Sequence, residues 1–164
     1  MKRTVGILIA VFIGSVFSSA IFAEDCTKDD VRAKVEEVAA ALEKKGKSYF
    51  SEIPKIRFCG DNYVYVSDME VTILAHGWQP NLVGRNLISL KDDTGFKFFY
   101  ELLAKLKASS ATKDGTRYFN GTGWVKYRWP TPDDKTQLHT KLVYAKAILL
   151  PEGGNVFVAA GLSE

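Results

Sequence analysis

The sequence has few cysteines and little excess of positive over negative charge. It contains only two cysteines among 164 residues, and its formal net charge at pH 7 is +3. Two cysteines exclude a disulfide-dense mini-protein, and so small a net charge gives no reason to expect a nucleic-acid partner. With 46% hydrophobic and 25% charged residues, the composition is instead that of one ordinary globular domain.

Catalytic and nucleotide-binding motifs are also missing. The chain has two histidines and no HExxH, GxSxG, P-loop or GxGxxG pattern. Three pairs of adjacent aspartates fall in predicted turns or at a predicted helix start, where acidic side chains have local roles: Asp29-Asp30, Asp92-Asp93 and Asp133-Asp134. Because His76 has no evident acid–base partner, we expect no catalytic residue, no metal site and no cofactor, and we rank an enzyme last.

The longest apolar run stands at the N-terminus. A basic start at Lys2-Arg3 is followed by apolar residues over Val5–Phe17 and by small residues before the first acidic pair. This pattern predicts a secretory signal peptide over residues 1–23, cleaved after Ala23, with Ala20 as the second choice. An uncleaved anchor is the alternative, although the run reaches only the low end of the ~20 residues that span a bilayer.

Cleavage would leave residues 24–164 as a single, nearly neutral domain in the periplasm or outside the cell. No later stretch approaches the length of a membrane span. Cys26 and Cys59 both remain, and in an oxidising compartment such a pair most simply forms a disulfide. A metal pair or a redox pair is the alternative, but neither cysteine has CxxC spacing or a nearby histidine.

Apolar spacing predicts two helices and five strands. Val31, Val35, Val38 and Leu42 recur at helical spacing, which predicts one amphipathic helix to about Ile53, with a weak point at Gly46. A second helix is expected over 96–106. Strands are expected over 63–66, 71–75, 124–129, 138–150 and 155–160, with a loop over 76–93. The last three strands are joined by short turns and must be antiparallel neighbours, so the fold class is α+β.

A group of aromatic, basic and imidazole side chains is a candidate site. Two adjacent predicted strands and the start of the long loop contribute its members: Tyr127, Trp129, Lys141, Tyr144, His76 and Trp78. Aromatic walls with one cation and one imidazole suit a small anionic ligand, because the rings exclude water and strengthen charge-assisted hydrogen bonds. The alternative is that the aromatics fill the core and the Lys141 ammonium reaches solvent.

Four segments in this order resemble the single Cache domain family of extracytoplasmic sensors. They are VYVSDMEVTILAH (64–76), PNLVGRNLISLKDDTGFKFF (80–99), GWVKYRWP (123–130) and KLVYAK (141–146). The resemblance implies a PAS-like five-stranded antiparallel sheet, with the long N-terminal helix on one face and a ligand pocket on the other. It also implies a small carboxylate ligand such as acetate, propionate, pyruvate or lactate.

Carried over by motif, the expected ligand contacts are His76, Tyr127, Lys141 and Tyr144, with Trp129 and Trp78 beside them as walls. Leu82, Gly84 and Asn86 belong to the loop that closes the pocket. Strict alternation along a strand would place Lys141 and Tyr144 on opposite faces unless a bulge intervenes. Many members of the family have proline directly after the histidine, whereas Gly77-Trp78-Gln79 stands before Pro80 here.

The expected function is therefore ligand binding in an extracytoplasmic, sensor-type domain linked to chemotaxis or other signal transduction. Most members of the family continue into a membrane span and a signalling module, whereas this sequence ends at Glu164. We therefore expect a stand-alone form that relies on a membrane receptor or histidine kinase as partner. The alternative is a scaffold protein that dimerises through the N-terminal helix, which would need an exposed apolar helix face and a collapsed pocket.

Overall fold

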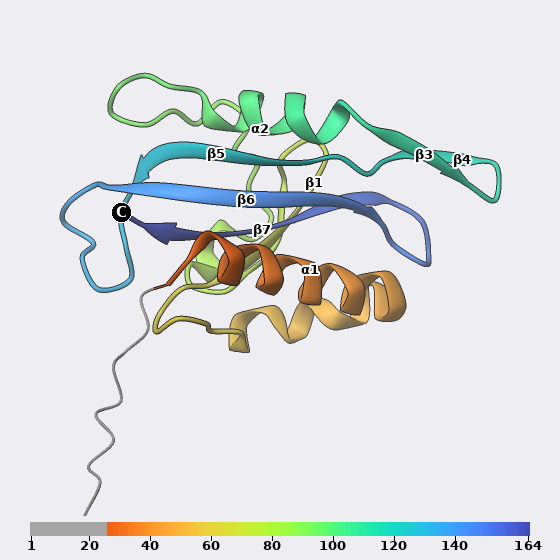
Figure 1. Cartoon of the computed structure of the whole chain (residues 1–164), viewed down its shortest axis with the longest axis horizontal. Helices are drawn as coiled ribbons and strands as arrows, with labels where there is room; N and C mark the ends of the chain where they lie inside the picture. The colour runs from red at the N-terminus through yellow and green to blue at the C-terminus, as the bar shows by residue number, and fades with distance from the viewer. Residues whose placement is uncertain (1–25) are drawn as a thin grey trace, which may run out of the picture.

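The computed structural model describes residues 26–164, in which an antiparallel sheet lies between two helical layers (Figure 1). The strands of the sheet are β1 (Val64–Asp68), β2 (Ile73–His76), β5 (Thr122–Trp129), β6 (His139–Leu149) and β7 (Asn155–Ser163). Their spatial order is β2-β1-β7-β6-β5, with every pair antiparallel. Helix α1 (Lys28–Lys45) covers one face and helix α2 (Phe98–Lys107) covers the other. The predicted α+β class and the PAS-like five-stranded sheet are confirmed.

The predicted signal peptide over residues 1–23 lies outside the described residues. None of the helices among residues 26–164 combines the length and the apolarity that a membrane span needs.

Helix α1 begins at a capping box and ends earlier than its apolar spacing predicts. The Thr27 hydroxyl accepts from the backbone N–H of Asp30, whose carboxylate in turn accepts from the N–H of Thr27. The spacing predicts a helix to Ile53, which is wrong beyond Lys45. Gly46 adopts a φ of 62°, a conformation that favours glycine and ends the regular helix. Two short 3-10 turns follow, at Gly46–Ser51 and Ile53–Lys55, and still bury Ile53.

The end of α1 is tied to the turn between β6 and β7. The Glu152 carboxylate in that turn accepts from the backbone N–H of Lys47 at 2.7 Å. A Cβ at Gly46 would lie within 2.1 Å of the same carboxylate. Glycine at position 46 therefore serves both the backbone conformation and this close approach.

The sheet is buried on both faces and separates two apolar cores. Alternate residues of each strand face opposite layers. The α1 core takes residues from the helix and from four strands, including Val35, Val66, Leu142, Ile148 and Val158. The α2 core includes Tyr65, Leu102, Val125, Val143 and Phe157. Strand register therefore decides which side chains reach the α2 face.

A hairpin of strands β3 (Ser110–Lys113) and β4 (Thr116–Phe119) was not expected from the sequence. Asp114 and Gly115 form its turn, and both have positive φ, at 50° and 77°, as hairpin turns require. The Asn155 side chain donates to the backbone oxygens of Phe119 and Ile148 at 2.9 and 2.8 Å. Figure 1 shows the hairpin projecting at the end of the molecule opposite the C-terminus.

The predicted disulfide between Cys26 and Cys59 is present. It joins the residue before the α1 cap to the turn that precedes β1, across a sequence separation of 33 residues. Asn62 lies beside it and donates from its side-chain nitrogen to the sulfur of Cys26 at 3.6 Å. The crosslink therefore fixes the start of α1 against the start of β1.

We expect the double change Cys26→Ser and Cys59→Ser to destabilise the protein by roughly 3.5 kcal/mol, since a loop of this length is no longer closed in the unfolded state. Urea unfolding followed by circular dichroism measures the difference. Reduction of the disulfide should lower the urea midpoint of the wild-type protein by a similar amount. The midpoint of the double variant should not change on reduction. Equal midpoints of variant and oxidised wild type would contradict the stabilising role.

Candidate ligand-binding site

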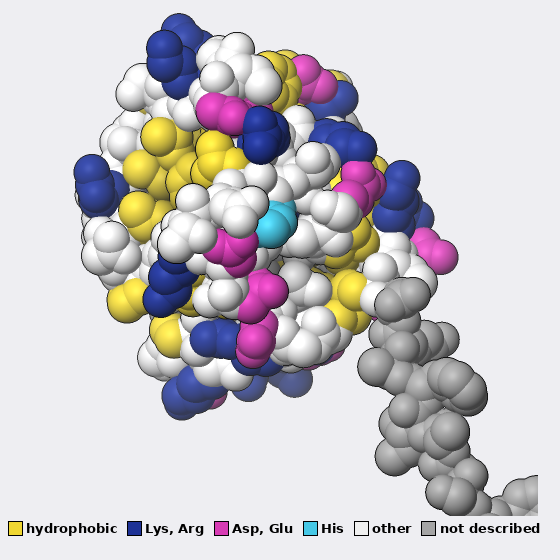
Figure 2. All heavy atoms as spheres, turned by 90° about the vertical axis from the view of Figure 1, so that its left-hand side faces the viewer, with side chains coloured by type: hydrophobic (Ala, Val, Ile, Leu, Met, Phe, Trp, Pro, Cys, Tyr) yellow, Lys and Arg dark blue, Asp and Glu magenta, His cyan; other side chains and the backbone are white. Residues whose placement is uncertain are grey.

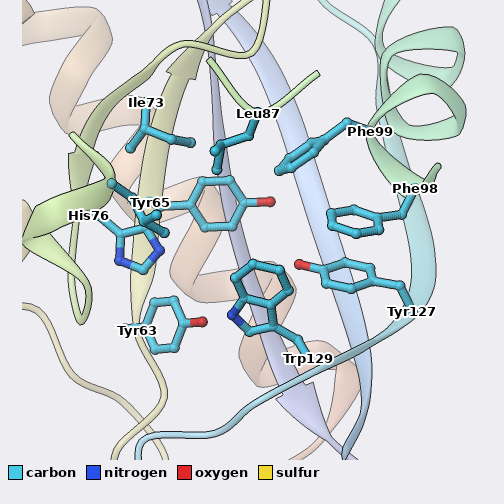
Figure 3. Close-up of a pocket in the computed structure, with 10 residues that line it drawn as sticks. Tyr63, Tyr65, Ile73, His76, Leu87, Phe98, Phe99, Tyr127 and Trp129 are labelled. Carbon is cyan, nitrogen blue, oxygen red and sulfur yellow. The ribbon is translucent and has the colours of Figure 1, made fainter. Parts of the chain in front are cut away.

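The α2 face of the sheet encloses a small pocket (Figure 3). Its cavity volume is about 20 Å³, slightly more than the roughly 10–15 Å³ that one water molecule needs. The segments that form its wall are β1 with the residue before it, β2, the loop after β2, the start of α2 and the end of β5. The lining residues are Tyr63, Tyr65, Ile73, His76, Leu82, Leu87, Phe98, Phe99, Tyr127 and Trp129. The space is therefore narrow and largely aromatic.

Small residues in the centre of the sheet make room for the aromatic rings at its sides. Tyr65 on β1 pairs with Ala159, Ala159 with Ala145, and Ala145 with Gly123 on β5. A Cβ at Gly123 would lie 2.6 Å from the side chain of Lys105 on α2. The missing side chains thus let α2 approach β5 and leave space above the central strands.

Polar atoms of the lining converge on the pocket. Figure 3 shows the hydroxyls of Tyr63, Tyr65 and Tyr127 and the indole nitrogen of Trp129 pointing inward from opposite sides. Burial raises the pKa of all three phenols, so each hydroxyl keeps its proton at neutral pH. Within residues 26–164 the buried hydroxyl of Tyr65 has no hydrogen-bond partner. The pocket therefore presents neutral donors without a matching anion.

His76 adds another neutral donor at the end of β2. Its Nδ1 accepts from the backbone N–H groups of Trp78 and Gln79 at 3.1 and 2.9 Å. A neutral imidazole whose Nδ1 accepts carries its proton on Nε2. Burial lowers the pKa of His76 to about 4, with smaller contributions from the positive charges of Lys141 and Arg57. The ring is therefore uncharged at physiological pH.

Gly77 allows the chain to turn sharply behind this histidine. Its backbone N–H donates to the carbonyl of Val64 at 2.9 Å. A Cβ at position 77 would lie 2.9 Å from both that carbonyl oxygen and the Cβ of Tyr63. Such contacts are too short, so glycine is needed to bring the loop after β2 close to the start of β1.

Lys141 is the one buried cation in the described part of the chain. It lies on β6 opposite Tyr127 of β5 and Ser163 of β7, and its side chain is on the pocket side of the sheet. Its ammonium lies 3.9 Å from the ring centre of Tyr63. Across residues 26–164 this ammonium has no hydrogen bond or ion pair. Burial lowers the pKa of Lys141 to about 7.

The first turn of α2 closes the pocket from above. The ring of Phe98 stacks on that of Tyr127, with ring centres 3.9 Å apart and an interplanar angle of 7°. Trp129 meets Phe98 edge to face at 6.1 Å. These contacts fix the orientation of the Tyr127 hydroxyl and separate the pocket from solvent.

The second histidine belongs to a different part of the surface. Nε2 of His139 lies 3.1 Å from the carboxylate of Asp134 in the loop between β5 and β6. Hydrogen bonds from Thr136 and then from His139 lower the pKa of Asp134 to about 2. Figure 2 shows this end of the molecule, with a histidine close to acidic side chains on the surface. The aspartates of this loop thus have local structural partners.

Several residues expected at the site lie at the pocket. His76, Tyr127 and Trp129 line it, while Lys141 lies behind the ring of Tyr63. Trp78 is half-buried and packs on Tyr63 with ring centres 5.5 Å apart, outside the lining. Contact of any of them with a ligand stays a prediction.

Tyr144 lies away from this pocket, contrary to expectation. The register of β6 runs without a bulge from Lys141 to Leu149, so Tyr144 and Lys141 point to opposite faces. The Tyr144 hydroxyl donates to Glu36 of α1 at 3.3 Å, and its ring belongs to the α1 core.

Four lining residues were not predicted as part of the site from the sequence: Tyr63, Tyr65, Phe98 and Phe99. The alternation of Tyr63-Val64-Tyr65 places both tyrosines on one face of β1, and this signal was present in the sequence. In the predicted closing loop, Leu82 lines the pocket. Gly84 and Asn86 instead hydrogen-bond to the backbone around β2, at Ile73 and Glu70, and so cover its outer edge.

Solved structures with a similar fold include domains of chemotaxis proteins. A periplasmic sensor domain of a chemotaxis protein matches with a TM-score of 0.63 and 25% identity, over 82% of this chain and 93% of that one. A methyl-accepting chemotaxis protein from Vibrio parahaemolyticus matches with a TM-score of 0.61 and 20% identity, over 83% and 87%. A Cache chemosensory domain studied for its recognition of carboxylic acids matches with a TM-score of 0.58 and 24% identity, over 84% and 99%.

The chain belongs to the Single Cache domain 2 family, whose sequence profile matches residues 23–152. The methyl-accepting chemotaxis protein McpP of Pseudomonas putida is 29% identical over 77 residues, which are 47% of this chain and 12% of that protein. This chain thus aligns with a small part of the length of that relative. The family and the structural neighbours are sensor domains and not enzymes, and the resemblance noted in the sequence is confirmed.

We expect Lys141→Met to stabilise the free protein below pH 7 by on the order of a few kcal/mol, because a charged lysine is no longer buried. The unfolded lysine has a pKa of 10.5 and the folded one about 7. The cost of the lysine is therefore complete below pH 7 and disappears as the pH rises to 10.5, where both states are uncharged.

Urea unfolding of both proteins at pH 6, 8 and 9.5 measures this difference, which should shrink as the pH rises. The control is Lys126→Met on β5, where an exposed lysine pairs with Glu164. A loss of stability in Lys141→Met at every pH would show that the ammonium is well solvated or paired in the native protein.

Proposed function

We propose that residues 24–164 form an extracytoplasmic sensor domain that binds a small carboxylate in the pocket beneath α2. Acetate, propionate, pyruvate and lactate are the expected ligands. The observation that carries the proposal is the buried ammonium of Lys141 beside a group of neutral donors, without any anion to match it within the described residues.

The charge distribution fits an anion of one unit charge. Lys141 is the buried cation beside the pocket among the described residues, and its neighbours offer N–H and O–H donors from His76, Tyr63 and Tyr127. A carboxylate accepts several such hydrogen bonds, which are strong when water is excluded. A second carboxylate would have to be buried among apolar and neutral groups, so dicarboxylates are disfavoured.

The dimensions and the apolar part of the lining fit a short acid. The cavity volume of about 20 Å³ leaves little space, so even a ligand of a few atoms requires small shifts of the lining side chains. Tyr63 separates the cavity from Lys141, and a shift of its ring would bring the carboxylate to the ammonium. The remaining wall, with Ile73, Leu87 and Phe99, suits a methyl or ethyl group.

Membership of the Cache family supports a sensor function, whereas the class of ligand is argued from the pocket residues of this chain. One similar structure is a Cache domain that recognises carboxylic acids, but at 24% identity its likeness extends to the fold alone. Chemotaxis proteins among the relatives agree with a role in signal transduction. Our proposal includes secretion to the periplasm or beyond by the signal peptide, and a membrane receptor or histidine kinase as partner.

The alternative function, a scaffold protein that dimerises through α1, requires an exposed apolar face on this helix. The surface of α1 does not show such a face. The exposed residues of α1 are all charged or alanine: Lys28, Asp29, Asp30, Arg32, Ala33, Glu37, Ala40, Glu43, Lys44 and Lys45. The larger apolar residues of the helix are all buried against the sheet.

A short carboxylate should raise the melting temperature of the purified protein. At a concentration 100 times the Kd, binding would add about 2.7 kcal/mol to the free energy of unfolding, which corresponds to a shift of several degrees. Differential scanning fluorimetry with acetate, propionate, pyruvate and lactate measures it, with acetamide as an uncharged control.

Lys141→Met should abolish the shift, whereas Lys126→Met should retain it, because Lys126 lies on the neighbouring strand outside the pocket. If the folded wild-type protein shows no shift with any of the four acids, the proposal is wrong.

Tyr65→Phe should separate ligand affinity from stability. Its buried hydroxyl has no partner in the free protein, so its removal should leave the free energy of unfolding equal or raise it by about 1 kcal/mol. The same change should weaken carboxylate binding roughly five- to tenfold, through one lost hydrogen bond.

Calorimetric titration and urea unfolding measure the two effects of Tyr65→Phe. Tyr100→Phe, at a tyrosine of α2 that is 52% exposed, is the matched control and should change neither. If Tyr65→Phe binds the carboxylate with unchanged affinity, the Tyr65 hydroxyl does not hydrogen-bond to the ligand.

A further inference from the structure

The residue Lys141 is buried without a carboxylate that compensates the charge of its ammonium. The side chain is only 3% exposed. In the described part of the chain no carboxylate lies within ion-pair distance of it, and no hydrogen bond involves it. Its ammonium lies over the face of the Tyr63 ring, 3.9 Å from the ring centre, which is a favourable cation–π contact. Such an environment favours the uncharged amine over the ammonium.

The groups beside Lys141 on the neighbouring strands are neutral, and His139, two residues before it on β6, lies 3.1 Å from the Asp134 carboxylate. The neutral groups are Tyr63 before β1, His76 at the end of β2, Tyr127 on β5 and Ser163 on β7. Helix α2 contributes Phe98 and Phe99 to the same space, and its Glu101 pairs with Lys105 outside the pocket. Glu164, next to Ser163, pairs with Lys126, while α1 lies on the other face of the sheet. Arg57 adds a positive charge that acts on His76.

Lys141 is therefore the group at this site whose charge changes near neutral pH. Its pKa of about 7 results from burial alone. His76, with a pKa of about 4, stays neutral from pH 6 upward, and the buried phenols keep their protons because burial raises their pKa. A negative charge placed beside the amine would raise the pKa of Lys141 and draw a proton to it.

We propose that a carboxylate and a proton bind to this site as a pair, with the proton on Nζ of Lys141. The proposal rests on the proposed function and adds a second ligand to it. A carboxylate beside a neutral amine would leave one uncompensated negative charge in the pocket, whereas the pair is electrically neutral. The domain would then respond to the proton concentration as well as to the concentration of the acid.

The coupling has a definite sign. Above pH 7 the free protein must take up a proton when the anion binds, so the apparent Kd should rise by up to about tenfold per pH unit. Between pH 6 and 7 Lys141 becomes mostly protonated beforehand, and the Kd should level off. The same linkage means that bound carboxylate raises the pKa of Lys141.

Isothermal titration calorimetry with acetate in two buffers of different ionisation enthalpy counts the protons that accompany binding. From a free pKa of about 7, we expect uptake of about 0.9 proton per acetate at pH 8 and about 0.1 at pH 6. Acetate binding with no proton uptake at pH 8 would overturn this proposal and leave the proposed function standing. Failure of acetate and the other short acids to bind a folded protein would overturn both.

Lys141→Arg separates charge from proton uptake, since a guanidinium stays protonated at every pH tested. This variant should bind acetate with no proton uptake and with a Kd that stays flat from pH 6 to 9. Lys126→Met, which removes a charge from the neighbouring strand, should retain the wild-type uptake. If Lys141→Arg proves unfolded by circular dichroism, the two-buffer measurement on the wild-type protein decides alone.

Discussion

The register of the central strands is the constraint on which both the fold and the site depend. Because the sheet is buried on both faces, each buried apolar residue of β6 and β7 belongs either to the α1 core or to the α2 core. A slip of one residue in β6 would move Lys141 to the α1 side and bring Leu142 beneath the pocket. Thus the same pairing that closes the hydrophobic core also determines which cation and which hydroxyls meet beneath α2.

The sequence predicted the architecture well because helices and strands here have clear periodicity and turn signals. It predicted the end of α1 poorly: apolar residues continue to Ile53, and only Gly46 and its contact with Glu152 show where the helix stops. The hairpin after α2 was missed although Asp114-Gly115 is a hairpin turn, because its strands are exposed and carry no alternating apolar pattern.

The site was predicted in part for the same physical reason. His76, Tyr127 and Trp129 stand where a strand ends and a loop begins, so their place at one end of the sheet follows from the order of the elements. Which face each side chain takes is harder, since strands buried on both sides lack a polar face to orient them. Tyr65 was therefore overlooked and Tyr144 was misassigned, although simple alternation along β6 already separates Tyr144 from Lys141.

The disulfide gives the pocket wall a covalent connection to the chain that enters α1. Tyr63 follows Asn62, and Asn62 hydrogen-bonds to the sulfur of Cys26 and to the backbone of Cys59. Any displacement of the Tyr63 ring that reaches its backbone acts on a segment crosslinked to Cys26, the residue before the N-cap of α1. Ligand-dependent movement would therefore be transmitted to the N-terminal end of α1 by covalent bonds, a stiffer path than the apolar contacts between the helix and the sheet.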